Sequence, residues 1–303
     1  MSLKNSTKKY TDDYYVKIEK LYQAITEAEA IVIGAGAGLS TAAGFNYKGK
    51  RFEENFSDFA QKYGIKDIYS GGFYKFATLE EYWAWWSRSI YLNRYVQAEK
   101  PIFAQLLALL KGKNYFVITT NVDHQFQIAG FPKERLYYMQ GDFGLWQCSK
   151  PCSQITYDNE ETVMKMLAEQ KDMKIPSELI PYCPVCGAPL TMNLRVDNTF
   201  VQDEGWYKAK ERYDRFIYDN KDRHTLFWEI GVGDNTPMII KYSFWQFVGN
   251  NPQATYASVN LQNAFLPEFL EDQEIYIKAD AAQVIEDLFD LAQNEEKKTD
   301  FGQ

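Results

Sequence analysis

Four cysteines form the clearest group of metal-binding residues in the chain. Cys148 and Cys152 have three residues between them, and Cys183 and Cys186 have two. Two short-spaced cysteine pairs are typical of a tetrahedral zinc site built from four thiolates. Four unrelated buried thiols or two disulfides are the alternatives, and disulfides are rare in cytosolic proteins. Because four sulfur ligands leave no position for water, the pattern predicts one structural zinc ion.

A glycine-rich turn is a second candidate. Gly34, Gly36 and Gly38 follow an apolar stretch and precede Ser40 in GAGAGLSTAAG. Glycines let backbone amides approach a pyrophosphate, and a helix N-terminus favours its negative charge. The usual dinucleotide fingerprint would have a glycine in place of Leu39 and an acidic residue at the end of the next strand, and this chain meets neither condition. The turn predicts phosphate binding outside the dehydrogenase context, with a tight strand–helix junction as the alternative.

Two polar residues follow another apolar stretch, in TTNVDHQF at 119–126. Open α/β sheets bind their ligands where strands end, and Asn121 and Asp123 alternate so that both could project into one cleft. An aspartate there can bond ribose hydroxyls or a carboxamide and stabilise positive charge that develops on a sugar. The alternative is an Asx turn that closes the loop.

Gln140, in YYMQGDFG, stands where a strand is expected to turn. A site for a phosphorylated cofactor commonly includes a general base, most often histidine, and glutamine cannot exchange a proton near neutral pH. The chain has two histidines. His124 is a weak candidate for the base because it adjoins Asp123, and adjacent side chains usually point apart. His224 is expected at the surface.

Composition narrows the class of protein. At 303 residues, with 46% hydrophobic and 24% charged residues, the chain suits one large domain with a smaller inserted one. We find no apolar run long enough for a membrane span and no secretory signal, so a cytoplasmic location and no membrane partner are expected. A net charge of −8 disfavours nucleic acid as a partner.

Helices and strands are predicted to alternate. Helical periodicity and end signals predict helices over 13–28, 102–111, 238–248 and 281–293. Short apolar stretches predict strands at 30–33, 115–119, 225–231, 254–260 and 274–279. Thr236 and Pro237 are expected to open the third helix, and Asp280 to cap the last. The alternation predicts an α/β fold with a parallel sheet and helices on both faces.

Two segments interrupt this alternation. Residues 45–100 read as irregular and then helical, and their aromatic stretch LEEYWAWWSRSIYLNRY favours a core helix over a lid or peptide groove. Residues 144–193 hold all four cysteines. We therefore expect residues 1–44, 101–143 and 194–303 to form the large domain. The two insertions would form a smaller helical and zinc-ribbon-like domain.

In chain order these motifs resemble those of the sirtuins. Over about residues 25–293 the chain contains the following motifs in sirtuin order: GAGAGLSTAAGF, TTNVDH, QGD, the cysteine pairs, IGVG, VN and ADAAQV. The resemblance implies a Rossmann-type domain that binds NAD, with Asn121 and Asp123 at the nicotinamide ribose and carboxamide. The implied catalytic residues are Asn121, Asp123 and Gln140. The implied cofactor-binding residues are these three with Gly34, Ala35, Gly36, Ser40, Gly231, Gly233, Asn260 and Asp280.

Two departures from the sirtuin pattern narrow the implied activity. FNYKGKRF at 45–52 replaces the usual Pro-Asp-Phe-Arg, and Gln140 replaces the catalytic histidine. Both changes resemble the macrodomain-linked sirtuins of microbes, which are protein ADP-ribosyltransferases. That resemblance implies a protein acceptor, such as a lipoyl-carrying protein related to the glycine-cleavage carrier, and a macrodomain hydrolase as a further partner.

The chemistry of NAD agrees with that implication. Nicotinamide in NAD is already a cationic pyridinium, so its departure needs positioning and nearby negative charge rather than an acid. Deacylation needs a further step in which a base deprotonates a ribose hydroxyl, and losing such a base typically costs a factor of about 10² to 10⁴. Gln140 therefore favours ADP-ribosyl transfer. A weak deacylase or NAD hydrolase, or a non-catalytic NAD-sensing module, are the alternatives.

Overall fold

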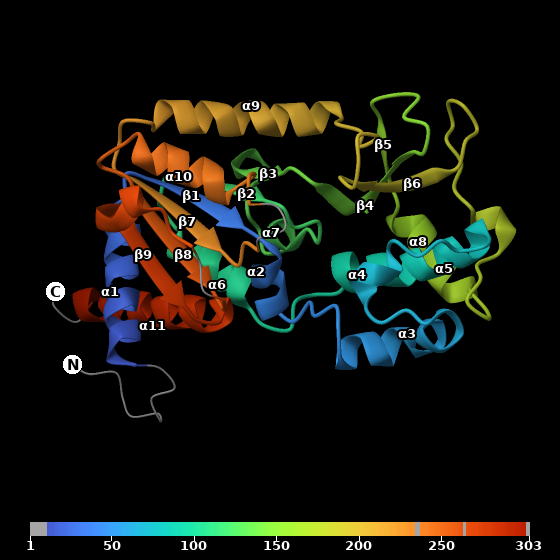
Figure 1. Cartoon of the computed structure of the whole chain (residues 1–303), viewed down its shortest axis with the longest axis horizontal. Coiled ribbons are helices and arrows are strands. Elements are labelled where there is room, and N and C mark those ends of the chain that lie inside the picture. Colours follow the sequence, from blue (N-terminus) through green and yellow to red (C-terminus); the bar gives the residue numbers. More distant parts are fainter. Residues whose placement is uncertain (1–10, 234–236, 263–264, 301–303) are drawn as a thin grey trace.

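The strands form two sheets in two lobes of the molecule (Figure 1). The computed structural model describes residues 11–233, 237–262 and 265–300. The larger sheet has the strand order β3-β2-β1-β7-β8-β9, and each neighbouring pair is parallel. Its strands are β1 (Ala30–Ala35), β2 (Tyr115–Thr119), β3 (Leu136–Tyr138), β7 (Thr225–Ile230), β8 (Thr255–Asn260) and β9 (Glu274–Lys278). This order confirms the predicted Rossmann-type sheet.

The strand order reverses between β1 and β7. From β1 the chain moves outward through β2 to β3, and it then returns to β7 on the other side of β1. Ligands of open parallel sheets bind at such a reversal, outside the carboxyl ends of the strands. The glycine-rich turn follows β1, and Gly231 follows β7, so both lie at this point.

Helices cover both faces of the larger sheet. On one face Ile31 and Ile33 of β1 pack in a hydrophobic core with α1, α6 and α11, while Val32 packs on the other face with α9 and α10. These helices are α1 (Asp12–Glu27), α6 (Ile102–Leu109), α9 (Glu204–Asp219), α10 (Lys241–Gly249) and α11 (Ala281–Asp300). Because β1 is buried on both faces, it contains only apolar residues and glycine, as a central parallel strand requires.

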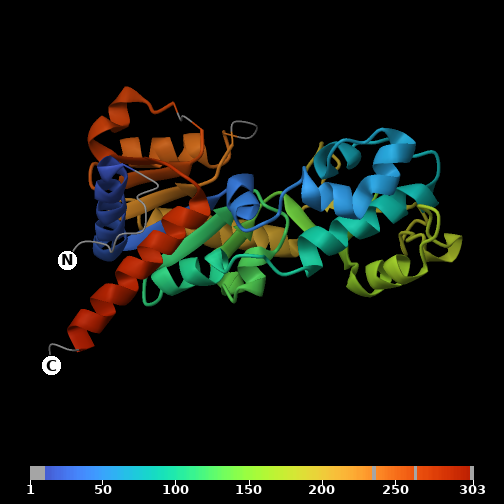
Figure 2. The same ribbon diagram turned by 90° about the horizontal axis from the view of Figure 1, so that it is seen from below.

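The smaller lobe lies at one end of the larger one in both views (Figures 1 and 2). Its antiparallel sheet has the order β5-β4-β6. Its elements are α3 (Lys50–Tyr63), α4 (Ile68–Gly71), α5 (Leu79–Ile90), η1 (Tyr91–Tyr95), β4 (Gly141–Cys148), β5 (Thr156–Asp158), α8 (Glu160–Glu169), η3 (Ser177–Leu179) and β6 (Leu190–Leu194). Trp83 and Trp85 of α5 are fully buried in the core of this lobe, so the aromatic stretch is a core helix.

The structure differs from the predicted elements in several places, and α9, β5, α8 and β6 were not predicted. Residues 50–63, which were predicted to be irregular, form the helix α3. The helix is amphipathic, because Phe52, Phe56 and Phe59 lie on one face and charged residues lie on the other. The helix predicted from residue 238 begins at Lys241, and Thr236 lies outside the described residues. β4 continues past the predicted domain boundary at 143, and the domain division itself stays a prediction.

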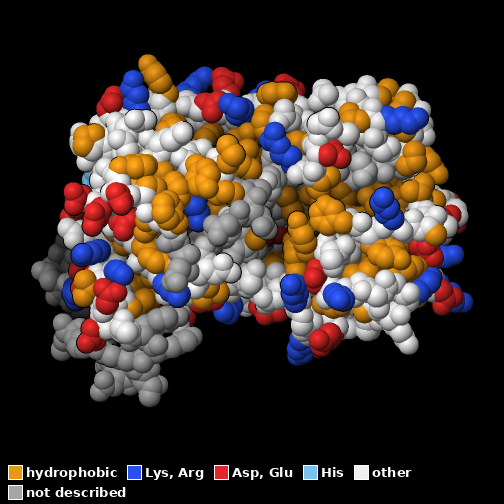
Figure 3. All heavy atoms as spheres, in the orientation of Figure 1, with side chains coloured by type: hydrophobic (Ala, Val, Ile, Leu, Met, Phe, Trp, Pro, Cys, Tyr) orange, Lys and Arg blue, Asp and Glu red, His pale blue; other side chains and the backbone are white. Residues whose placement is uncertain are grey.

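The short remaining elements lie next to strands of the larger sheet in the chain. They are α2 (Ala37–Ala42), α7 (Gln125–Ile128), η2 (Lys133–Arg135) and η4 (Glu268–Gln273). On the face seen in Figure 3, hydrophobic side chains are exposed on both lobes. Within the described ranges, no helix is both long and apolar enough to span a membrane.

Candidate active site and cysteine site

The glycine-rich turn packs directly against the loop that follows β7. Gly36 donates its amide to Ile230 (3.0 Å), and Gly38 donates to Gly231 (2.8 Å). A Cβ atom at Gly36 would lie 2.6 Å from the carbonyl oxygen of Gly231, and Gly231 itself has a left-handed φ of 62°. Side chains are therefore excluded by the close approach of two loops, which is the tight junction that the sequence left open as an alternative.

Gly34 has a different reason to be glycine. A Cβ atom there would lie 2.4 Å from Ile240 and 2.6 Å from Phe244. The residue thus lets α10 pack closely on β1. Ala35 comes next, at the end of the strand, where its carbonyl accepts from the Thr119 hydroxyl (3.0 Å).

A polar cluster forms where the loops after β1 and β2 meet. Ser40 donates its hydroxyl to Asp123 in a short hydrogen bond, and Asn121 donates its amide to Ser40 Oγ (2.8 Å) and to the carbonyl of Gly36 (2.9 Å). Three residues predicted from two separate motifs, Ser40, Asn121 and Asp123, therefore lie together at the carboxyl ends of neighbouring strands. This is the edge of the sheet where ligands of such folds bind.

Burial dominates the electrostatics of Asp123. Its side chain is almost fully buried, and this burial raises the pKa of the carboxyl above its ordinary value. The hydrogen bond from Ser40 opposes the rise, and the nearby charge of Asp142 adds to it. A buried carboxylate that lacks a counter-charge is disposed to stabilise positive charge on a bound molecule.

A second carboxylate, Asp142, lies in β4, two residues after Gln140. Its Oδ2 contacts His124 Nδ1 (2.5 Å), and its Oδ1 accepts from Arg94 Nε (2.8 Å) and from the backbone amide of Gly144 (2.7 Å). Burial alone would raise the pKa of Asp142, but the hydrogen bond and charge of His124 and the charge of Arg94 lower it overall. Neither Asp142 nor Arg94 was predicted as a site residue from the sequence, because no local pattern pairs residues 94 and 142.

The two histidines and Gln140 have different surroundings. His124 faces Asp142 while its neighbour Asp123 faces Ser40, so the adjacent side chains do point to different partners. His224 is partly exposed at the start of β7. Gln140 occupies the turn between β3 and β4, where its carbonyl accepts from the Arg195 amide (3.0 Å), and its side chain makes no hydrogen bond with the described residues.

The residues implied for the adenosine half are spread over the next strands. Asn260 donates to the carbonyl of Val232 (2.8 Å), which ties the end of β8 to the loop that holds Gly231. Gly233 is exposed in that loop. Asp280 caps α11 by accepting from the Ala282 amide (3.0 Å), as predicted, and it also lines a pocket beside Leu261.

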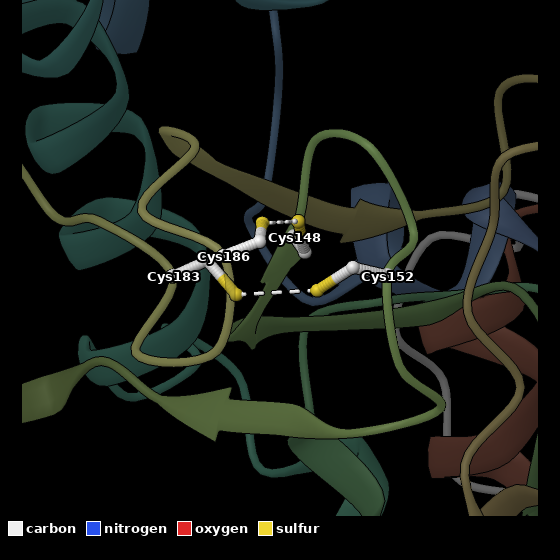
Figure 4. Close-up of side chains that lie close together, drawn as sticks. All are labelled: Cys148, Cys152, Cys183 and Cys186. Carbon is white, nitrogen blue, oxygen red and sulfur yellow. Dashed lines mark hydrogen bonds between the residues drawn. The ribbon is translucent and has the colours of Figure 1, made fainter.

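The four cysteines meet in the smaller lobe (Figure 4). All four sulfur atoms lie within 4.8 Å of one another, and the pairs Cys148–Cys186 and Cys152–Cys183 are each 3.5 Å apart. A tetrahedral zinc ion with Zn–S bonds of about 2.3 Å would separate its sulfurs by about 3.8 Å. The arrangement therefore suits zinc.

Comparison with known proteins gives two relatives by sequence. The chain is 37% identical over 275 residues to a protein ADP-ribosyltransferase of Staphylococcus aureus, covering 90% of this chain and 87% of that protein. It is 32% identical over 234 residues to a probable bifunctional ADP-ribose hydrolase/ADP-ribosyltransferase of Fusarium oxysporum, covering 72% of this chain and 38% of that protein. No family model matches the chain. The chain belongs to the protein ADP-ribosyltransferase family.

Solved structures that resemble this chain include sirtuins. A Sir2 enzyme bound to a propionylated peptide matches with a TM-score of 0.59 and 17% identity, over 91% of this chain and 99% of the other. A Sir2 homologue in complex with NAD matches with a TM-score of 0.55 and 18% identity, over 91% and 94%. At these identities the likeness shows a shared fold. Family and fold together indicate an enzyme.

Proposed function

We propose that the protein transfers ADP-ribose from NAD to a side chain of another protein and releases nicotinamide. The meeting of Ser40, Asn121 and Asp123 at the point where the strand order reverses carries this proposal. It supports a site in which the nicotinamide ribose lies against Asp123 and Asn121, with the pyrophosphate beside the glycine-rich turn. Gly231, Gly233, Asn260 and Asp280 would then serve the adenosine half.

The proposed reaction exchanges the group bonded to ribose C1′. The bond between nicotinamide nitrogen and C1′ breaks, and its electron pair leaves with nicotinamide. The acceptor side chain supplies the pair that forms the new bond to C1′, and its proton passes to solvent. Positive charge builds on the ribose as the first bond breaks, so a buried carboxylate such as Asp123 lowers the barrier. Asn121 would hold the reacting group in place.

Gln140 supports transfer over deacylation. Sirtuin deacylation needs a general base after nicotinamide has left, and a carboxamide cannot accept a proton near neutral pH. His124, the nearest imidazole, is engaged by Asp142 through Nδ1. We therefore propose that deacylation is at most a side reaction, with NAD hydrolysis as the competing outcome.

We propose a structural zinc ion at the four cysteines. Four sulfur ligands fill a tetrahedral site, so the ion would hold the end of β4 against the Cys183–Cys186 turn and would not take part in the reaction. Cys183 donates its amide to Ala188 (2.7 Å) and Gly187 donates to Cys183 (2.8 Å), which gives this turn its fixed shape.

The acceptor is proposed to be a lipoyl-carrying protein related to the glycine-cleavage carrier, and a macrodomain hydrolase is proposed to reverse the modification. The bifunctional name of the Fusarium relative supports a hydrolase acting together with the transferase. The implied cytoplasmic location also remains a prediction from sequence.

Labelled NAD separates the candidate reactions. The purified protein is incubated with NAD labelled in the adenine ring, with and without a lipoylated carrier protein. We expect label on protein together with released nicotinamide. Free ADP-ribose as the main product would identify an NAD hydrolase, and intact NAD in every mixture would identify an NAD-sensing module, so either result would contradict transfer.

A further inference from the structure

Asp142 joins three segments that are distant in the sequence. It lies at the start of β4, two residues after Gln140, and its carboxylate contacts His124 from the loop after β2 and Arg94 from η1 of the smaller lobe. Only a small fraction of the Asp142 side chain, 6%, is exposed, and both oxygens are engaged. The contacts therefore form a buried polar junction between the two lobes, directly beside the candidate active site.

The smaller lobe presents Arg94 to this junction on an unusual turn. η1 is a π-helix that follows α5, and π-helical turns are rare and frequently occur at functional sites. Arg51 of α3 holds this turn, because it donates to the carbonyl of Leu92 (2.6 Å) and to Asn93 Oδ1 (2.9 Å). Gly144 leaves room for the arginine, since a Cβ atom there would lie 2.8 Å from Arg94 Nε.

His124 is the part of the junction that reaches the reacting centre. Its backbone has φ 62° and ψ 14°, a left-handed conformation that is uncommon outside glycine, although asparagine, aspartate and histidine adopt it more often than other residues. This conformation sends the side chains of Asp123 and His124 to different partners, Ser40 and Asp142. An imidazole that is anchored to Asp142 can keep the backbone of His124 in the left-handed conformation. The direction of the Asp123 carboxylate depends on that conformation.

We propose that Asp142 is a positioning residue for ADP-ribosyl transfer, which holds His124 by its Nδ1 and so keeps Asp123 directed at the nicotinamide ribose. The inference rests on the proposed function. It assigns His124 an anchoring role through Nδ1, and not a proton-transfer role through Nε2. Arg94 and Gly144 hold the same carboxylate, so the position of the smaller lobe is linked to the geometry of the reacting centre.

Two substitutions of His124 separate these roles. Asparagine tolerates the left-handed conformation and carries an amide where Nδ1 stands, so His124→Asn keeps the donor to Asp142. Glutamine carries its amide farther out, near the place of Nε2, and does not tolerate that backbone conformation as well. The exposed Glu161→Gln, which removes a surface ion pair with Lys165, serves as the control.

The experiment measures nicotinamide release, which does not depend on knowing the acceptor, as a function of NAD concentration. We expect Asp142→Asn and His124→Gln to lower kcat by about tenfold to a hundredfold, with KM for NAD little changed. His124→Asn should keep most of the activity, and Glu161→Gln all of it. A His124→Asn variant that loses as much as His124→Gln would overturn the proposal, and so would a wild-type kcat in Asp142→Asn.

Amide hydrogen exchange without NAD gives a second readout. Residues 121–126 should exchange faster in Asp142→Asn and His124→Gln than in the wild type, and at the wild-type rate in His124→Asn. Unchanged exchange in all variants would also overturn the proposal. If the wild type releases no nicotinamide, the proposed function fails, and the exchange pattern still decides whether Asp142 anchors the loop.

Discussion

The two lobes are held together by different means. In the larger sheet, β1 and β7 are fully buried between two hydrophobic cores, so apolar burial dominates there, and the buried Glu229 of β7 is paired with Lys241. In the smaller lobe, β5 is half-exposed, one aromatic core supports the sheet, and four thiols lie close together. We therefore propose that the larger lobe folds without metal, that the smaller one needs the proposed zinc, and that the active site depends on both.

The largest expected effect comes from removing the metal. Structural zinc contributes about 10 kcal/mol or more to the folding of small sites. Cys183→Ser should remove the zinc found by elemental analysis and abolish the near-ultraviolet signal of the buried tryptophans in the smaller lobe, while the helical signal of the larger lobe persists. The exposed Ser149→Ala is the control. A metal-free protein with native spectra would show that the two lobes do not differ in this way.

A smaller loss of stability should follow when one buried tryptophan in each lobe is replaced by alanine, which leaves a cavity of similar size in each. Trp85 and Trp228 are both fully buried, the first against Phe56 and the second in β7. Truncation of either to alanine should cost about 3–5 kcal/mol. Hydrogen exchange should rise only in the smaller lobe of Trp85→Ala, and throughout the larger sheet of Trp228→Ala. If both variants show the same pattern, the lobes unfold as one unit and the comparison fails.

The two carboxylates beside the active site should respond to pH in opposite directions. Burial raises the pKa of Asp123 above its ordinary value of 3.8, so its contribution to stability is present below that pH and is lost as pH rises through the folded pKa. Asp123→Asn should therefore gain stability over the wild type as pH rises from about 4 to 7. Urea unfolding at several pH values measures this difference.

Asp142 should show the opposite pH dependence to Asp123. Its pKa is lowered, so its contribution is present above 3.8 and is lost as pH falls through the folded pKa. Asp142→Asn should therefore be less stable than the wild type at neutral pH, and the gap should close in acid. Parallel pH profiles for the two variants would contradict the assigned electrostatics.

The smallest effects concern Gln140. Gln140→Ala should slow NAD turnover by about fivefold, which corresponds to one hydrogen bond of about 1 kcal/mol to the ribose. Gln140→His should give some deacylation of an acyl-lysine peptide, because an imidazole can accept the ribose proton that glutamine cannot. Mass spectrometry of the peptide measures this. Efficient deacylation by the wild type would show that Gln140 is no barrier.

The features that could be predicted from the sequence are those that depend on residues close together in the chain. The buried strands, the cap at Asp280 and the cysteine pairs follow from residues that lie close together in the chain. α3 and α9 were missed although Phe52, Phe56 and Phe59 of α3 recur at helical spacing, because both segments are rich in charged residues. The packing role of Gly34 against Phe244, and the pairing of Arg94 with Asp142, depend on contacts between distant segments, which no periodicity reveals.

The central claim is that Asn121 and Asp123 carry out the transfer of ADP-ribose from NAD. The most direct test is label transfer from adenine-labelled NAD to protein by the wild type, Asn121→Ala and Asp123→Ala, with circular dichroism as the check on folding. We predict labelled protein with the wild type and none with either variant, while all three spectra agree. Transfer at the wild-type rate by both folded variants would contradict the claim and place the chemistry elsewhere in the molecule.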